Sequence, residues 1–167
     1  YKGKMLKFIC LLLLPLAGTA QQQGRVTLVK DGDTFEILMD NAKHNCRLAG
    51  VDAPELSQPY GKVSRDSVRK LLEGKIIVFC FLKEDLYRRW VVSILQVEGK
   101  PIAVENLLIQ NGWAWNYEQY NKLKSGKKLQ QEAQTNHRGL WECPNPIPPW
   151  IYRGMNAQYK RWYARCK

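Results

Sequence analysis

The segment RVTLVKDGDTFEILMDNAKHNCRLAGVDAPE, residues 25–55, contains both the strand pattern that sets the fold and a dense group of charged residues. Strand-like residues run from Arg25 to Lys30 and from Thr34 to Met39, on either side of Asp31-Gly32. Asp-Gly between two such runs is a strong signal for a tight β-hairpin. A third strand is expected from about residue 44 to residue 51, so this segment predicts three consecutive strands.

Two further strands and three helices are expected downstream. β-branched and aromatic residues predict strands over residues 75–82 and 89–97. Apolar residues at helical spacing predict helices over residues 61–73, after Pro101 (which would lie near the first turn) and over residues 122–138. The expected apolar faces are Val68, Leu71 and Leu72, then Val104, Leu107 and Leu108, then Leu129, Ala133 and His137, and the expected C-terminal capping glycines are Gly74, Gly112 and Gly139.

These elements together indicate a mainly β fold with helices. Five short strands and about three α-helices are typical of a small five-stranded barrel of the oligonucleotide-binding (OB) type. Such a barrel leaves no exposed sheet edge and offers a groove to a strand of nucleic acid. With 167 residues and 45% hydrophobic content, the chain fits one globular domain.

The N-terminal 20 residues have the layout of a secretory signal. Lys7 precedes an apolar run from residue 8 to residue 16, and small residues follow up to Ala20. We expect cleavage near Ala20 and a secreted or periplasmic protein, with an uncleaved membrane anchor as the alternative. Removing residues 1–20 takes away three lysines from a chain of net charge +11, which leaves +8. The remaining charge indicates an anionic partner, either nucleic acid or an anionic membrane surface.

The cysteines suit an oxidising compartment. Cleavage removes Cys10 and leaves Cys46, Cys80, Cys143 and Cys166, an even number that allows three pairings. We favour Cys46 with Cys80 and Cys143 with Cys166. A zinc site is the alternative, but no Cys-x-x-Cys spacing is present.

The charged residues of the opening segment suit chemistry on a phosphodiester. Such a reaction needs its phosphate charge neutralised, a water directed at phosphorus and a base for the proton of that water. Asp33, Arg47, Asp52 and Glu55 could supply these functions. In the alternative interpretation, Asp33 forms a turn, Arg47 is a surface charge, and Asp52 and Glu55 cap the next helix.

The order and spacing of three motifs resemble the staphylococcal nuclease (thermonuclease) family. The motifs are Asp31-Gly32-Asp33-Thr34, residues 47–55 and Asp85-Leu86-Tyr87-Arg88-Arg89. The resemblance continues through Gly61, Asn106-Leu107, Gly112-Trp113-Ala114 and Gly139-Leu140-Trp141, and covers roughly residues 25–153. It implies a calcium-dependent phosphodiesterase that cleaves the 5′ P–O bond and leaves 3′-phosphate ends.

The resemblance also implies individual roles. Asp33 and Asp52 look like the side-chain metal ligands, and Ala53, where the family more often has Thr, would add its carbonyl oxygen. Arg47 and Arg89 resemble the residues that grip the phosphate, Glu55 resembles the residue that orients or deprotonates water, and Tyr87 matches a position beside the nucleotide. The family usually has Gly before the second arginine, so Arg88 is the alternative to Arg89.

The ligand set agrees with calcium on chemical grounds. Ca²⁺ takes six to eight oxygen ligands, so two carboxylates and one carbonyl leave places for water and a phosphate oxygen. So few charged ligands imply weak binding, with a Kd on the order of 10⁻⁴ to 10⁻³ M.

Aromatic residues after the second expected helix could form part of the substrate site. Trp113, Trp115, Tyr117 and Tyr120 could stack on bases, and Trp113 and Trp115 could equally belong to the core. We therefore add Tyr117 to Tyr87 as a substrate-binding residue.

The C-terminal part is expected to lie outside the core. Residues 143–150 contain four prolines and should run extended over the surface. Residues 154–167 form a basic tail with Met155, Tyr159, Trp162 and Cys166 at helical spacing, which predicts an amphipathic helix. This helix either packs against the barrel or follows the phosphate backbone of a bound nucleic acid.

The sequence therefore predicts an exported, monomeric, calcium-dependent nuclease that hydrolyses DNA and RNA with little sequence preference. We expect no stable membrane association after the signal is cleaved. Two alternatives remain open: an OB barrel that binds nucleic acid without catalysis, and a periplasmic membrane-tethered adaptor whose positive charge faces lipid.

Overall fold

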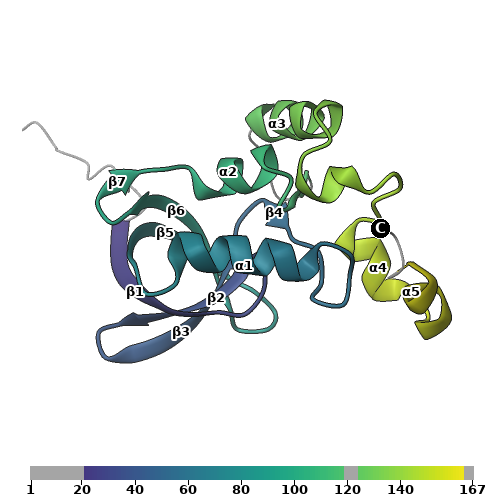
Figure 1. Cartoon of the computed structure of the whole chain (residues 1–167). Helices are drawn as coiled ribbons and strands as arrows, with labels where there is room; N and C mark the ends of the chain where they lie inside the picture. Colours follow the sequence, from purple (N-terminus) through teal and green to yellow (C-terminus); the bar gives the residue numbers. More distant parts are fainter. Residues whose placement is uncertain (1–20, 119–123, 164–167) are drawn as a thin grey trace, which may run out of the picture.

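Five strands close into a barrel in this computed structural model, which describes residues 21–118 and 124–163 (Figure 1). Antiparallel pairing gives the order β3-β2-β1-β5-β6, and a parallel pairing between β3 and β6 closes the sheet. The strands are β1 Gln21–Val29, β2 Thr34–Met39, β3 Ala42–Leu48, β5 Ile76–Glu84 and β6 Trp90–Val97. The predicted five-stranded barrel and the hairpin at Asp31-Gly32 are confirmed.

Three short strands outside the barrel strands change two predictions. The third strand ends at Leu48 rather than near residue 51, because Gly50 adopts a left-handed turn with φ 68°. β4 (Val51–Asp52) then pairs with β8 (Trp115–Asn116), away from the barrel sheet. β7 (Lys100–Pro101) pairs with β6, so Pro101 lies in a strand and not in the first turn of a helix.

Apolar side chains from the barrel and the first two helices form the core. Alternation along the strands sends one set of side chains inward, and the fully buried residues include Val26, Phe35, Ile37, Leu48, Ile77, Phe79, Val92 and Ile94. α1 (Gly61–Leu72) packs against β1 and buries Val68 and Leu72, as predicted. α2 (Val104–Gln110) buries Val104, Leu108 and also Ile109.

α3 (Lys124–Thr135) packs against α2. Its predicted apolar face is confirmed for Leu129 and Ala133 but is wrong for His137. The helix ends two residues before His137, which is exposed and has φ 50°. The Arg138 N–H donates to the Ala133 carbonyl at 2.9 Å and so satisfies a carbonyl at the helix end.

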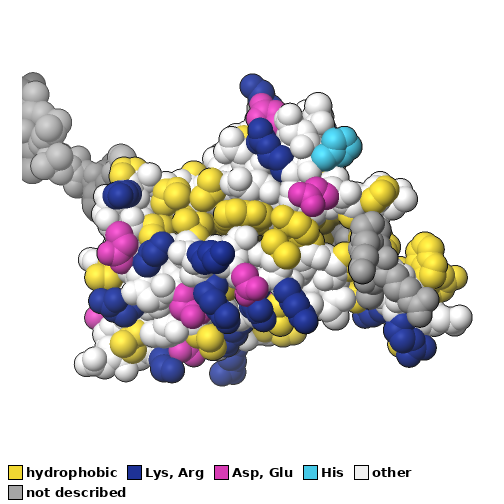
Figure 2. Space-filling model, in the orientation of Figure 1, with side chains coloured by type: hydrophobic (Ala, Val, Ile, Leu, Met, Phe, Trp, Pro, Cys, Tyr) yellow, Lys and Arg dark blue, Asp and Glu magenta, His cyan; other side chains and the backbone are white. Residues whose placement is uncertain are grey.

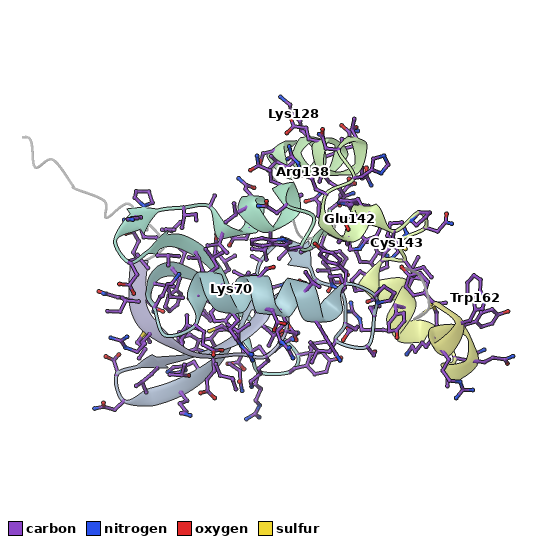
Figure 3. The ribbon with its side chains drawn as sticks, in the orientation of Figure 1. Lys70, Lys128, Arg138, Glu142, Cys143 and Trp162 are labelled. Atoms are coloured by element: carbon purple, nitrogen blue, oxygen red, sulfur yellow. The ribbon has the colours of Figure 1, made fainter. Side chains whose placement is uncertain are left out.

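The chain after Gly139 contains more helical structure than the sequence predicts. A 3₁₀ turn, η1 (Gly139–Glu142), is followed by α4 (Pro149–Gly154) and α5 (Ala157–Tyr163). Residues 149 and 150 are therefore helical, because Pro is well suited to the first turn of a helix. The predicted tail helix exists, but Tyr159 and Trp162 are 59% and 71% exposed, and Trp162 points away from the molecule (Figure 3). Tyr163 is the buried residue instead.

The cysteines differ from one of the two expected pairings. Cys46 and Cys80 both keep their thiols, so the predicted bridge between them is wrong. β6 separates their strands, since Cys46 lies opposite Trp90 and Cys80 opposite Ser93. Cys46 is fully buried, and burial raises the pKa of its thiol to about 12. Cys143 is disulfide-bonded, but Cys166 lies outside the described residues, so their pairing stays a prediction.

The face shown in Figure 2 mixes both signs of charge. Basic and acidic side chains alternate over α1, and a band of hydrophobic side chains lies above that helix. Arg69 of α1 forms an ion pair with Glu73, which follows the last residue of the helix, at 3.4 Å. No helix in residues 21–118 or 124–163 is long and apolar enough to cross a membrane. The expected signal, residues 1–20, lies outside the part that the structure describes.

Candidate active site

The loop between β1 and β2 fixes Asp33. The Asp31 carboxylate accepts backbone N–H groups from Asp33 at 3.0 Å and Thr34 at 2.7 Å, which is an Asx turn. Burial, followed by the nearby charge of Asp33, raises the pKa of Asp31 to about 6. A Cβ on Gly32 would lie 2.1 Å from Ser64 Oγ, so only Gly allows the loop to approach α1 this closely.

Arg47 joins two buried carboxylates. Its Nη1 lies 2.5 Å from Asp33 Oδ1, and its Nη2 lies 3.1 Å from Asp52 Oδ1 and 3.2 Å from the Val51 carbonyl. Asp33 and Asp52 are only 4% and 1% exposed. Burial raises the pKa of Asp52, and burial also opposes the charge of Arg47, but the two carboxylates outweigh that effect and raise the pKa of Arg47. The guanidinium therefore remains charged between them.

The turn after β4 connects Ala53 and Glu55 to this cluster. The Ala53 N–H donates to Asp33 Oδ2 at 2.7 Å, so its main chain already contacts the predicted metal ligand, although through nitrogen. The Glu55 N–H donates to Gln58 Oε1 at 2.9 Å. The Glu55 carboxylate is 39% exposed and accepts from Arg153 Nη1 at 2.9 Å. Arg153 thus links Glu55 to the buried cluster, and the sequence did not predict it as a site residue.

Arg89, not Arg88, faces the cluster. Its Nε lies 2.8 Å from Asp85 Oδ2, and its Nη1 donates to Thr34 Oγ1 at 3.4 Å. Thr34 Oγ1 in turn donates to Asp33 Oδ1 at 3.0 Å. Arg88 is exposed with φ 57°, a conformation that favours glycine, which explains why the family usually has Gly there. Burial would raise the pKa of Asp85, but hydrogen bonds from Arg89 and Tyr87 lower it overall.

The two predicted tyrosines line one groove with the first arginine. This open groove of about 700 Å³ has Arg47, Gly50, Asp85, Tyr87, Tyr117 and Arg153 among its lining residues. Tyr87 is 81% exposed, and its ring centre is 5.4 Å from the Arg89 guanidinium carbon. Tyr117 stacks on Trp150 at 5.2 Å. Trp115 packs edge-on against Trp141 and Trp150, so it supports the groove wall; Tyr120 lies outside the described residues.

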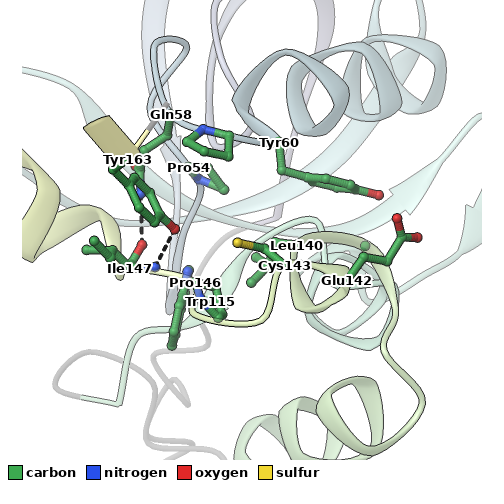
Figure 4. A pocket seen from close by; sticks show the side chains of 12 residues that line it. Pro54, Gln58, Tyr60, Trp115, Leu140, Glu142, Cys143, Pro146, Ile147 and Tyr163 are labelled. Carbon is green, nitrogen blue, oxygen red and sulfur yellow. Dashed lines mark hydrogen bonds between the residues drawn. The ribbon is translucent and has the colours of Figure 1, made fainter. Parts of the chain in front are cut away.

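Residues of the C-terminal extension, which we define as residues 144–163, were missed as part of the site. Tyr152 Oη donates to the Ser57 carbonyl at 3.1 Å, and Gln58 Nε2 donates to the Ile147 carbonyl at 2.8 Å. Figure 4 shows the second of these bonds at a small pocket of about 180 Å³ beneath the extension. No local pattern could have revealed these contacts, because they join residues about 90 positions apart in the chain.

The donor chemistry fits a hard cation. Asp33 and Asp52 share one guanidinium, and their oxygens are the ligand type that Ca²⁺ prefers. No cluster of three or more His, Cys, Asp or Glu side chains within residues 21–118 and 124–163 could hold a metal by itself. The predicted ligand set of two carboxylates and a main-chain oxygen stays a prediction.

Comparison with known proteins agrees with this geometry. The family model described as "Staphylococcal nuclease homologue" matches residues 45–143. An uncharacterized endonuclease of Escherichia coli O157:H7 is 38% identical over 134 residues, which cover 80% of this chain and 86% of the relative. A micrococcal nuclease of Shigella flexneri is 30% identical over 150 residues, which cover 85% and 86%. This chain therefore belongs to the staphylococcal nuclease family.

Proposed function

We propose that this protein is a calcium-dependent endonuclease that hydrolyses DNA and RNA with little sequence preference and leaves 3′-phosphate ends. The observation that carries the proposal is the placement of Asp33, Arg47 and Asp52 in one buried cluster beside a groove whose lining includes two arginines and two tyrosines. The endonuclease and nuclease names of the relatives support the reaction class.

Asp33, Asp52 and the Ala53 carbonyl would hold the calcium ion. When bound, Ca²⁺ supplies positive charge that polarises a phosphoryl oxygen. Two carboxylates are few for a calcium site, so we expect weak binding, in the range of extracellular calcium modules. An exported protein can use such an affinity because extracellular calcium is abundant.

The two arginines would bind the scissile phosphate. Arg47 contacts Asp33 directly, and Arg89 is linked to Asp33 through Thr34. Guanidinium groups donate paired hydrogen bonds to phosphate oxygens, and they stabilise charge that grows in the transition state. Lys has a single ammonium group and would perform this function poorly.

Glu55 would direct the attacking water. Its carboxylate is partly exposed, unlike those of Asp33 and Asp52, so it can contact solvent and still lie beside the buried cluster. A carboxylate in this position can accept a proton from water as the oxygen attacks phosphorus.

Low sequence preference follows from the contacts available. Phosphate contacts carry no base information, and the exposed ring of Tyr87 can stack on any base. We also propose that the mature protein acts as a secreted or periplasmic monomer without stable membrane association.

The test is hydrolysis of denatured DNA and of RNA by the chain from Gln21 onward, with Ca²⁺ or with a chelator. We expect release of acid-soluble nucleotides with Ca²⁺ and none with the chelator. Labelling the products with a kinase before and after phosphatase treatment identifies the phosphate-bearing end. Activity that persists in the chelator would overturn the calcium assignment, and binding without hydrolysis under both conditions would favour a non-catalytic barrel.

A further inference from the structure

Arg153 lies among the acidic residues of the site. Its Nη2 is 2.8 Å from Asp52 Oδ2, and its Nη1 is 3.3 Å from Asp52 Oδ1 and 2.9 Å from Glu55 Oε1. Its side chain is 48% exposed, whereas that of Asp52 is 1% exposed. One arginine therefore binds both oxygens of a predicted metal ligand and one oxygen of the predicted base.

Hydrogen bonds from neighbouring residues fix the helix that carries Arg153. α4 begins at Pro149, and its Tyr152 hydroxyl contacts both the carbonyl and the hydroxyl of Ser57, at 3.1 and 3.2 Å. The Ile147 N–H donates to the Tyr163 hydroxyl at 2.6 Å, which ties α5 to the segment before α4 (Figure 4). Arg153 is thus carried on a fixed helix, in contrast to a surface arginine whose ion pair forms and breaks freely.

The extension also fixes the loop that carries Glu55. Gln58 is buried and uses both ends of its amide: Oε1 accepts from the Glu55 N–H at 2.9 Å, and Nε2 donates to the Ile147 carbonyl at 2.8 Å. The same two segments are therefore joined once through Gln58 and again through the Arg153–Glu55 ion pair. These two connections indicate that Arg153 is held beside Glu55 by the fold.

The charge balance shows what Arg153 does there. Asp33, Asp52 and Glu55 contribute three negative charges and Arg47 one positive charge, so the cluster without Arg153 has a net charge of −2. Arg153 reduces this to −1 and donates to both Asp52 oxygens. Hydrogen bonding to Asp52 raises the pKa of Arg153, so its charge is permanent. A divalent cation that binds Asp52 must share or displace these hydrogen bonds.

We propose that Arg153 is a positioning residue of the active site, which holds Asp52 and Glu55 as a built-in counter-ion and competes with the divalent cation for Asp52. This inference rests on the proposed calcium function. Arg153 also lines the groove with Arg47 and Tyr117, so the guanidinium has space to move into when a metal ion takes Asp52. In that position its charge would face the bound phosphate.

The proposal predicts the direction of a change in calcium affinity. Replacing Arg153 with Gln removes a competing cation at hydrogen-bond distance from Asp52, and we expect Ca²⁺ to bind about tenfold more tightly, which corresponds to about 1.4 kcal/mol. If Arg153 only fastened α4 to the barrel, its loss would leave the affinity unchanged or weaken it, because the ligands would be less ordered.

The experiment is calorimetric titration of Ca²⁺ into the substrate-free protein, with wild type, Arg153→Gln and Arg153→Ala. Arg161→Gln is the matched control, since it removes the same charge from the exposed surface of α5. Circular dichroism melting checks that each variant folds. We expect both Arg153 variants to bind more tightly, and the control to stay within about twofold of wild type.

Two results would overturn the proposal. Equal or weaker Ca²⁺ binding by both folded Arg153 variants would show that Arg153 does not compete for Asp52, while leaving the calcium-dependent nuclease intact. Wild-type protein that binds no Ca²⁺ would remove the calcium assignment and this inference together.

Discussion

Arg47 is a counter-ion that two carboxylates share inside this protein. An isolated buried carboxylate loses several kcal/mol of hydration, and its pKa rises until it is neutral. Arg47 compensates Asp33 and Asp52 at once and also donates to the Val51 carbonyl. The planar fork of a guanidinium reaches all three acceptors, which an ammonium group cannot do. The chemistry of the site and the stability of the fold thus depend on the same side chain.

Arg47→Gln should therefore lower the free energy of unfolding in the absence of divalent cations. We expect a loss of about 3 kcal/mol, because breaking the buried pair leaves Asp33 without its arginine, whereas Asp52 keeps Arg153. The measurement is urea denaturation at pH 7. The control is Arg65→Gln on α1, whose pair with Asp66 is partly exposed to solvent and should be worth less than about 1 kcal/mol. Equal losses in the two variants would show that the buried carboxylates do not need Arg47.

At the scale of elements, two glycines determine how α2 meets the turn after α3. Gly139 has φ 60°, and a Cβ there would lie 2.4 Å from the Gly112 carbonyl oxygen. A Cβ on Gly112 would in turn lie 2.1 Å from the Arg138 carbonyl oxygen. The Leu140 N–H donates to Gly112 O at 2.8 Å across this contact. The two backbones touch directly, so neither position accepts a side chain.

Gly139→Ala is expected to cost about 3 kcal/mol of unfolding free energy, because the backbone must separate in addition to the strain of a left-handed residue. Gly99→Ala is the matched control. Gly99 has a similar φ of 71°, but a Cβ there meets no atom within 4 Å, so only the conformational cost of about 1 kcal/mol applies. Thermal or urea unfolding of both variants measures the difference. A Gly139 variant no less stable than the Gly99 variant would contradict the close contact.

Glu105 links α2 to β6 and gives stability a pH dependence. Its carboxylate accepts the Ile94 N–H at 3.0 Å, and burial raises its pKa above the ordinary value of 4.5. The folded state therefore binds more protons than the unfolded state as the pH rises through 4.5. The free energy of unfolding falls over this interval and levels off above the folded pKa.

Glu105→Gln keeps an acceptor for Ile94 and removes this titration. The difference in unfolding free energy, wild type minus variant, should fall from pH 4.5 upward and then become constant. Urea denaturation from pH 4.5 to pH 8 measures it. A difference that does not change with pH would contradict the raised pKa of Glu105.

Local patterns predicted the elements that depend on local chemistry. The sequence predicted the Asp-Gly hairpin, the apolar face of α1 and the glycine after that helix. Turn geometry and helical spacing depend on only a few neighbouring residues. The sequence did not predict the end of the third strand before Gly50 or the pairing of β4 with β8. Both depend on a partner strand more than 60 positions away. His137 was assigned to a helix that ends before it, since periodicity alone does not locate a helix end.

Site residues that lie in sequence motifs could be predicted. Those that reach the site only through the tertiary fold could not. Asp33, Arg47 and Asp52 lie in motifs of distinctive spacing, and the structure brings them together. Arg153 follows a proline-rich segment without any motif, and it meets Asp52 across about 100 residues. The choice of Cys46 with Cys80 failed for a related reason: strand character does not say which strands are neighbours.

At the scale of the whole molecule, four distant segments build one site. The β1–β2 loop supplies Asp33, the turn after β4 supplies Glu55, the turn before β6 supplies Arg89, and α4 supplies Arg153. The closed barrel fixes the loops that carry Asp33 and Arg89, and the Ala53–Asp33 hydrogen bond joins the turn after β4 to them. The C-terminal extension adds Arg153 through its contacts with Ser57 and Gln58. The extension thus contributes Arg153 to the lining of the groove.

The most direct test of this assembly is the rate of DNA hydrolysis with Ca²⁺ for wild type, Glu55→Gln, Arg47→Lys and Arg65→Lys. Glu55 and Arg47 belong to the cluster, so kcat/KM should fall by about 10² to 10⁴ in each of those variants. Arg65→Lys keeps the charge at a partly exposed position on α1, outside the cluster, and should retain wild-type activity. Circular dichroism checks that each variant is folded. Equal hydrolysis by all four folded proteins would contradict the assignment, because the reaction would then occur away from this cluster.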